Sequence, residues 1–318
     1  MIPEEERTKS EAGRVGATKI VQKTDHEIAE SRDSAMRFGV HLSIQGGISK
    51  MAQAAVQLGC ETVQVFSRSP RGGKAKPLDP VDISKSDALL KVNDIRPLIV
   101  HAPYFVNLAS IESSKRDYSV EVLSEDLHRA EVLGARFVVT HIGHKQKEED
   151  DESQDALERA LGSIREVLSS YSGPARLVLE NSAGQGQEIG CTFEALGFLV
   201  KSLPPERVGA CFDTCHAFAR GYELSDPAKV ESTLLSFDGI VGLERLDVVH
   251  LNDCKRGLGS RVDRHFHIGQ GEIGLEGFRA VINSKLLPPD LPGIMETPKD
   301  SEDADKINLS TVRMLRGS

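Results

Sequence analysis

The sequence has no tryptophan, few cysteines and no long apolar segment. Its five cysteines are scattered and include no Cys-x-x-Cys pair. An odd number of scattered cysteines argues against a disulfide framework or a thiolate zinc finger, so buried thiols are expected. No apolar run approaches the roughly 20 residues that a membrane-spanning helix needs. We therefore expect a protein that does not enter a membrane.

The start of the chain lacks the basic and apolar regions of a signal peptide, which predicts a cytoplasmic protein. Residues 1–35 mix Glu, Lys, Arg, Gly and Ser without apolar periodicity. Such a segment cannot bury enough apolar surface to fold, so a mostly disordered extension is predicted there. Residues 36–318 are predicted to form one catalytic domain.

Positive charge is also in deficit, because the formal net charge is -9. This balance argues at first against a nucleic-acid partner, since phosphate contacts dominate the affinity of such complexes. Carboxylates that bind metal count as bare negative charges, however, and an acidic run at 148–152 lies away from any predicted strand end. Local charge is therefore the better guide to a partner.

From Phe38 onward, short apolar β-branched runs alternate with segments of helical period. The first two strands are predicted at 38–43 and 62–66, and six later strands at the residues discussed next. Helices are predicted at 48–58, 82–93, 113–133, 153–170, 192–202, 227–237, 275–284 and 303–315. Eight strand-helix units in about 280 residues predict a single (β/α)8 TIM barrel. An open doubly wound sheet is the alternative.

Each of the six later strands ends in a side chain that can bind metal. These residues are His101, His141, Glu180, Asp213, His250 and Glu296. Three more such residues, His216, Asp263 and His265, follow closely in the chain. One histidine at a strand end is often structural, but no packing requirement explains six. Because the carboxyl ends of barrel strands meet at one face, all nine are expected to converge there.

Imidazole mixed with carboxylate, without thiolate, suits zinc or manganese. Nine ligands are too many for one tetrahedral ion, and two or three ions fit the count. Four carboxylates would contribute -4 and three divalent ions +6. Such a site would stay cationic and would attract a phosphate.

These motifs resemble the endonuclease IV family of apurinic/apyrimidinic (AP) endonucleases, from about Val40 to Pro298. The segments that carry the resemblance are HAPYFVNLA at 101–109, ENSAGQG at 180–186, DTCHAF at 213–218, VHLNDCK at 249–255 and DRH at 263–265. The family implies a TIM barrel that holds three zinc ions per chain. It also implies hydrolysis of the phosphodiester bond 5′ to an abasic site, which leaves a 3′-hydroxyl and a 5′-deoxyribose phosphate.

The resemblance also assigns the ligands. The first zinc would take His101, His141 and Glu180. The second would share Glu180, which bridges the two ions, and take Asp213, His250 and Glu296. The third would take His216, Asp263 and His265. Glu180 and Glu296 would be the catalytic carboxylates.

The implied partner is damaged double-stranded DNA, bound by a monomer. Arg71 and Tyr104 would enter the duplex while the abasic nucleotide is flipped out. Lys255, Arg261 and Arg264 would contact phosphates. Other basic residues that suit phosphate contacts are Arg68, Lys74, Lys76 and Arg256.

The chain departs from the family after Arg71, where two glycines replace a common aromatic residue. Three extra histidines are expected near the barrel face where the strands end, here called the mouth. They are His41, His144 and His267, and they are interpreted as structural or supporting residues.

Two rival hypotheses stay open. Related barrels act as sugar isomerases or epimerases with one divalent ion held by two Glu, one Asp and one His. That chemistry needs only about four ligands and would leave Asp263, His265 and the basic loops without a task. A DNA-lesion binder that has lost catalysis is the non-enzymatic hypothesis, and the nine filled ligand positions argue against it.

Overall fold

A computed structural model of the chain describes residues 35–149 and 153–317. Its centre is a closed barrel of eight parallel strands, in the order β1-β10-β7-β6-β5-β4-β3-β2. The strands are β1 (Arg37–Leu42), β2 (Thr62–Phe66), β3 (Leu98–His101), β4 (Phe137–Thr140), β5 (Arg176–Glu180), β6 (Val208–Asp213), β7 (Leu246–His250) and β10 (Pro292–Met295). Because β1 pairs with both β2 and β10, the sheet has no open edge. The predicted TIM barrel is confirmed, and the open sheet is wrong.

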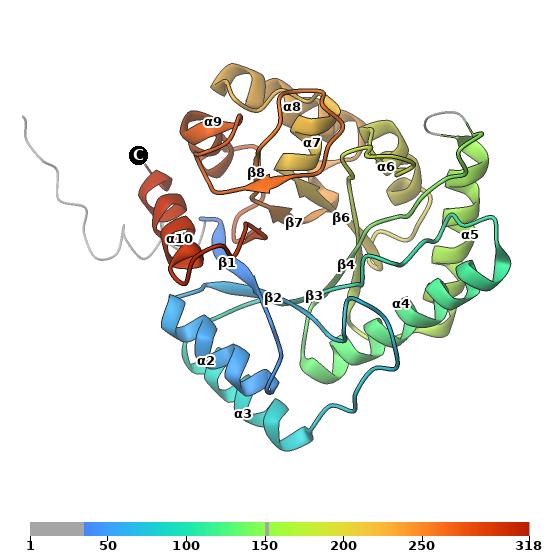
Figure 1. Ribbon diagram of the computed structural model, residues 1–318, viewed down its shortest axis with the longest axis horizontal. Coiled ribbons are helices and arrows are strands. Elements are labelled where there is room, and N and C mark those ends of the chain that lie inside the picture. The colour runs from blue at the N-terminus through green and yellow to red at the C-terminus, as the bar shows by residue number, and fades with distance from the viewer. Residues whose placement is uncertain (1–34, 150–152, 318) are drawn as a thin grey trace, which may run out of the picture. The chain divides into compact units, whose positions relative to one another are not determined.

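Within the described part of the chain, eight helices surround the strands (Figure 1). They are α2 (Ile48–Leu58), α3 (Pro80–Val92), α4 (Ser113–Leu133), α5 (Gln154–Ser170), α6 (Phe193–Lys201), α8 (Pro227–Ile240), α9 (Gly274–Ile282) and α10 (Ala304–Leu315). All lie within about three residues of the predicted ranges. Thr192 caps α6, where its hydroxyl accepts a hydrogen bond from the Ala195 amide at 3.2 Å. The cap satisfies an amide that the first turn leaves unpaired.

The barrel interior is filled by a separate apolar cluster, here called the plug. Its members are Ile99, Phe137, Val139, Val178, Cys211, Val248 and Ile294, and all are buried. Side chains on a strand alternate between the two faces of the sheet, so the residue two positions after a plug residue also points inward. That rule leads from Ile99 to His101, and likewise to each of the other five metal-capable residues at the strand ends. The same alternation therefore places the apolar plug inside the barrel and the metal-capable side chains at its mouth.

An ion pair joins β5 and β7 at the amino end of the barrel. Arg176 Nη1 lies 3.0 Å from Asp247 Oδ1, and both side chains are largely buried. Gly209 on β6 makes room for this pair, because a Cβ atom there would lie 1.7 Å from Asp247 Oδ2. Burial raises the pKa of Asp247 to about 6, although Arg176 acts to lower it.

The secondary structure differs from the sequence prediction in the segments that follow β6 and β7. No strand is predicted between the one that ends at His250 and the helix at 275–284, but β8 (Asp253–Cys254) lies there and pairs antiparallel with β9 (His265–Phe266). A short helix α7 (Thr214–Arg220) and a 3-10 turn η1 (Leu243–Arg245) were also not predicted. Helix α7 begins directly after β6 because Asp213 caps it, accepting from the His216 amide at 2.7 Å.

The predicted extension at 1–35 lies outside the described residues, apart from Ala35. All five cysteines are buried, as predicted. Among the residues that the structure describes, no helix is long and apolar enough to span a bilayer.

Candidate metal centre

The nine metal-capable side chains all lie at the carboxyl end of the barrel. Six come from the ends of β3 to β7 and β10. The other three come from α7 and from the hairpin of β8 and β9 with the loop that joins them. Each of the nine has an imidazole nitrogen or carboxylate oxygen within 3.8 Å of such an atom on another member. The structure thus brings together every residue of the predicted cluster.

Glu180 is at the centre of the cluster and is fully buried. Its Oε2 atom lies 3.2 Å from His101 Nε2 and 3.5 Å from His141 Nε2. Its Oε1 atom lies 2.9 Å from His250 Nδ1 and 3.3 Å from His216 Nδ1. One carboxylate therefore contacts four imidazoles.

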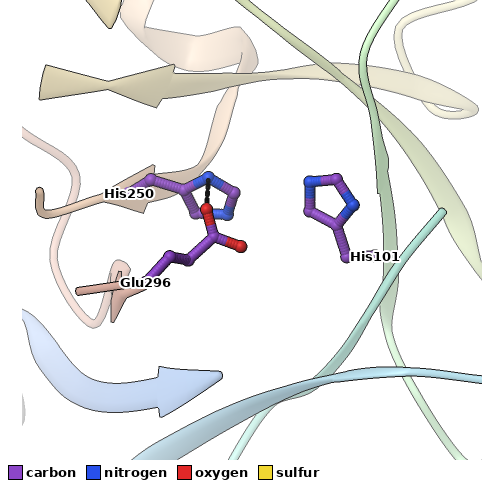
Figure 2. A group of neighbouring side chains, drawn as sticks. All are labelled: His101, His250 and Glu296. Atoms are coloured by element: carbon purple, nitrogen blue, oxygen red, sulfur yellow. Dashed lines mark ion pairs between the residues drawn. The ribbon is translucent and has the colours of Figure 1, made fainter. Parts of the chain in front are cut away.

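A second set of contacts converges on His250 Nδ1. Besides Glu180, this nitrogen faces Glu296 Oε2 at 3.4 Å and Asp213 Oδ2 at 3.8 Å. His250 and Glu296 lie side by side, and His101 faces them across the mouth (Figure 2). The ring centroids of His101 and His250 are 5.8 Å apart.

A third set lies over α7. Asp263 Oδ1 is 3.4 Å from His216 Nε2 and 3.4 Å from His265 Nε2. The two Nε2 atoms are themselves 3.3 Å apart. The hairpin of β8 and β9 supplies His265, so an element that the sequence did not predict completes this set.

The hydrogen bonds of the rings test whether this donor set fits a cation. In His101, His216 and His265, Nδ1 donates to a main-chain carbonyl oxygen, at 2.6, 2.9 and 3.2 Å. Each of these rings then has its lone pair on Nε2 unless a second proton is bound. The Nε2 lone pairs of His216 and His265 face each other. Such an arrangement is repulsive unless a proton or a metal ion lies between them.

The spacing of the donors also fits metal. Atoms held about 2.1 Å from a tetrahedral ion lie roughly 3.4 Å from one another. The contacts within the cluster mostly fall between 3.2 and 3.8 Å. The residues present therefore fit divalent ions, and their nitrogen and oxygen donors suit zinc.

The electrostatics of the cluster lead to the same conclusion. Burial lowers the pKa of His216, but Asp213 and then Asp263 reverse this effect and hold it well above its usual value. Burial raises the pKa of Glu180, but His250 and then His141 hold it well below its usual value. Both shifts favour the charged form of the group, so the cluster stabilises positive charge beside buried carboxylates, and a metal ion would compete with the proton on His216.

Two supporting residues hold the cluster in place. Asn252 Nδ2 donates to Asp213 Oδ2 at 2.7 Å, while its Oδ1 accepts from the Glu296 amide at 2.8 Å. Gln64 on β2 contacts both His250 and Glu296. Sequence reasoning gave Gln64 no role. The signal available was an amide side chain in the middle of a short strand, between two valines.

His41 at the end of β1 also lies in the mouth. Its Nδ1 atom is 3.4 Å from Glu296 Oε1, and its ring packs on Phe66 with centroids 4.3 Å apart. The other two extra histidines lie outside the cluster. His144 is exposed, and His267 pairs with Asp300 at 3.1 Å.

The predicted DNA-contacting residues come from loops that follow the barrel strands, and their exposure differs. Tyr104 is 60% exposed, and its ring centroid lies 6.0 Å from that of His101. Arg71, Lys255 and Arg264 are exposed. Arg261 is half-buried, and its Nε donates to the Gly184 carbonyl at 3.2 Å. Part of its guanidinium therefore binds the loop that follows β5.

Arg68 corrects one expectation. It was grouped with the phosphate-contacting residues, but its side chain is buried and pairs with Glu125 and with Asp126, the latter at 3.0 Å. It holds the loop after β2 against α4. The prediction that Arg68 suits a phosphate contact is wrong, because local sequence does not reveal acids on a helix some 60 residues away.

Comparison with known proteins places the chain in a family. A family profile described as "Xylose isomerase-like TIM barrel" matches residues 52–316. The "Probable endonuclease 4" of Methanosphaerula palustris is 40% identical over 281 residues, which cover 88% of this chain and 98% of that protein.

Solved structures agree. Endonuclease IV from Thermus thermophilus matches with a TM-score of 0.77 and 35% identity, covering 88% of this chain and 98% of that one. A D-tagatose 3-epimerase-like protein matches with a TM-score of 0.67 but only 21% identity, over 88% of this chain and 98% of the other, which shows the fold alone. The resemblance seen in the motifs is therefore confirmed, and the chain belongs to the endonuclease IV family of enzymes.

Proposed function

We propose that the protein is a zinc-dependent repair endonuclease that cuts duplex DNA at abasic sites. The bond hydrolysed would be the phosphodiester 5′ to the abasic deoxyribose, giving a 3′-hydroxyl and a 5′-deoxyribose phosphate. Three zinc ions per chain would bind to the three contact sets. They are His101, His141 and Glu180; Glu180, Asp213, His250 and Glu296; and His216, Asp263 and His265.

The observation that carries this proposal is the third set. His216 and His265 direct their Nε2 atoms at each other, 3.3 Å apart, beside the Asp263 carboxylate. A sugar isomerase or epimerase with one ion has no use for these residues. A third cation beside the other two suits a phosphodiester, since its phosphate carries negative charge through the reaction.

When bound, the ions would supply an activated water and the positive charge that offsets the phosphate. The chain's own residues do the positioning. Glu180 and Glu296 are the proposed catalytic carboxylates, because Glu180 belongs to two contact sets and Glu296 lies close to His250 of its own set and to His101 of the first. Asn252 fixes the Asp213 carboxylate and the main chain of Glu296 relative to each other. Burial excludes bulk water from Glu180 and so strengthens every charge interaction there.

The same face offers the contacts for DNA. Tyr104 and Arg71 would fill the space left when the abasic nucleotide leaves the duplex. Partial desolvation at the mouth, followed by the charges of Glu296 and Glu180, raises the pKa of Tyr104, so its hydroxyl stays protonated and can donate to a phosphate. Lys255 and Arg264 would contact the backbone, and Arg261 would both contact it and hold its loop.

We also propose a simple organisation for the whole chain. Residues 36–318 would be the catalytic barrel and residues 1–35 an extension with no part in catalysis. The enzyme would act as a monomer, because one barrel supplies all nine ligands and the basic residues around them. Light scattering on the purified protein tests the monomer, and a dimer mass would contradict it.

Two measurements on the purified protein test the function together. Elemental analysis should find three zinc ions per chain. A duplex that contains one abasic analogue should be cut on the 5′ side of the lesion, while the undamaged duplex stays intact. One bound manganese or magnesium ion, with conversion of a free ketose and no cleavage of the duplex, would instead establish a sugar isomerase. Three zinc ions with lesion binding but no cleavage would establish a DNA-lesion binder.

A further inference from the structure

Gln64 is a buried amide inside β2 whose side chain contacts three residues of the mouth. Its Oε1 atom lies 2.9 Å from His250 Nε2. Its Nε2 atom lies 2.7 Å from Glu296 Oε1 and 3.0 Å from His41 Nδ1. The amide therefore uses its oxygen on one side and both of its N–H groups on the other.

The orientation of this amide follows from its partners. The ionised carboxylate of Glu296 can only accept hydrogen bonds, so the amide nitrogen must face it. The amide oxygen then faces His250 Nε2, and that ring nitrogen must carry the hydrogen. The lone pair of His250 is left on Nδ1, which is the atom directed at Glu180, Glu296 and Asp213.

His250 differs in this respect from three other histidines of the cluster. In His101, His216 and His265 it is Nδ1 that donates, and the acceptor is a main-chain carbonyl that no substitution removes. In His250 the opposite nitrogen donates, and the acceptor is a side chain. The nitrogen that His250 presents to the cluster is therefore set by the identity of residue 64.

We infer that Gln64 is a positioning residue that presents His250 Nδ1, together with the Glu296 carboxylate, to the second metal ion. The inference rests on the proposed metal-dependent function and adds a residue from β2, which supplies none of the nine ligands. Groups that orient a ligating histidine typically change metal affinity about 10- to 100-fold when they are removed. We expect a loss of that size at the second site, with the other two sites affected less.

The test uses two substitutions and a matched control on the same strand. Gln64→Leu removes all three polar contacts at similar volume. Gln64→Glu keeps an acceptor for His250 Nε2 but cannot donate to Glu296. The control is Thr62→Val, because Thr62 is also buried in β2 but its hydroxyl donates to the Pro97 carbonyl at the opposite end of the barrel.

Two readouts apart from turnover decide the outcome. Zinc content is measured on the full chain during competition with graded chelator. On protein loaded with cadmium-113 and labelled with nitrogen-15 in histidine, spin coupling shows which ring nitrogen of His250 binds the ion. We expect coupling through Nδ1 in the wild type, in Gln64→Glu and in Thr62→Val. Gln64→Leu should lose the second ion at about 10- to 100-fold less chelator than Thr62→Val.

The possible results separate the two proposals. A wild type that holds no metal would refute the proposed function itself. A wild type with three ions whose affinity is unchanged in Gln64→Leu would refute only the role of Gln64, even if that variant melts at a lower temperature. Should Gln64→Leu fail to fold, coupling through Nε2 in the wild type or in Gln64→Glu would overturn the inference.

Discussion

At the scale of single residues, the cluster depends on carboxylates that are both buried and charged. We expect Glu296→Gln to abolish cleavage of abasic duplex while the protein stays folded. The amide keeps the volume of the side chain but removes the charge beside His250 Nδ1, 3.4 Å away. The check is a nicking assay combined with a thermal melt. Glu302→Gln, at an exposed position six residues further on, should cut normally, and comparable turnover in both variants would remove Glu296 from the site.

Arg71 provides a second test at a residue that binds no metal. Arg71→Ala should lower cleavage of abasic duplex about tenfold, the equivalent of about 1.4 kcal/mol, and leave three ions bound, because its role would be to position DNA. Turnover is measured at several salt concentrations, since lost phosphate contacts reduce the salt dependence. Arg165→Ala, exposed on α5, is the control. Loss of metal in Arg71→Ala would contradict the assignment.

Asp247 gives stability a pH dependence of its own. Its pKa is about 6 in the folded chain against an ordinary value of 3.8, so between these values the folded chain keeps a proton that the unfolded chain loses. The stabilisation is therefore complete below pH 3.8 and disappears as pH rises through 6. Relative to Asp247→Asn, the unfolding free energy of the wild type should fall by roughly 3 kcal/mol from about pH 4 to about pH 7. Denaturant titrations of both proteins at several pH values measure it, and a constant difference would contradict the assignment.

At the scale of elements, the hairpin of β8 and β9 depends on Asp253. This carboxylate accepts hydrogen bonds from five main-chain amides, at 2.8 to 3.3 Å. The donors are the amides of Cys254, Gly269, Gly271, Ile273 and Gly274. Asp253→Ala should therefore lower the unfolding free energy by about 3 kcal/mol, because the substitution leaves several amides unpaired.

The same variant should weaken the third contact set in particular, since His265 lies on β9 and pairs across the hairpin with Cys254. Hydrogen exchange of residues 265–274, compared with that of α5, measures this local loosening. Equal protection in both segments would show that Asp253 does not hold the hairpin.

Elements also show what the sequence could reveal and what it could not. Period-two alternation is a local property, so it places Ile99 and His101 on one face of β3 without knowledge of the rest of the fold. The barrel follows from eight repeats of a strand followed by a helix. By contrast, the pairing of Arg68 with Asp126 and the contacts of Gln64 depend on which distant strands and helices become neighbours. The hairpin of β8 and β9 was missed because each strand has only two residues and its order comes from amides bound to Asp253.

At the scale of the whole molecule, the barrel closes between β1 and β10 within the described residues. A protein that begins at Ala35 should therefore match the full chain in melting temperature, to within a few degrees, and in turnover on abasic duplex. The expectation also rests on the composition of residues 1–35, which is too poor in apolar residues to add a large buried surface. Calorimetry and the nicking assay compare the two proteins. A loss of ten degrees or more would show that the extension contributes to the fold.

The place of Glu180 has a consequence for how the enzyme takes up and loses its ions. Its two oxygens face His101 and His141 of the first contact set and His250 of the second, so neither of these two sets is complete without it. Removal of one of the two ions would leave part of a buried carboxylate uncompensated and weaken the grip on the other. Uptake should consequently be cooperative, with a Hill coefficient above one and few partly loaded molecules. If zinc binds as proposed, such an enzyme would respond to zinc supply as a threshold, with the first two sites either both loaded or both empty.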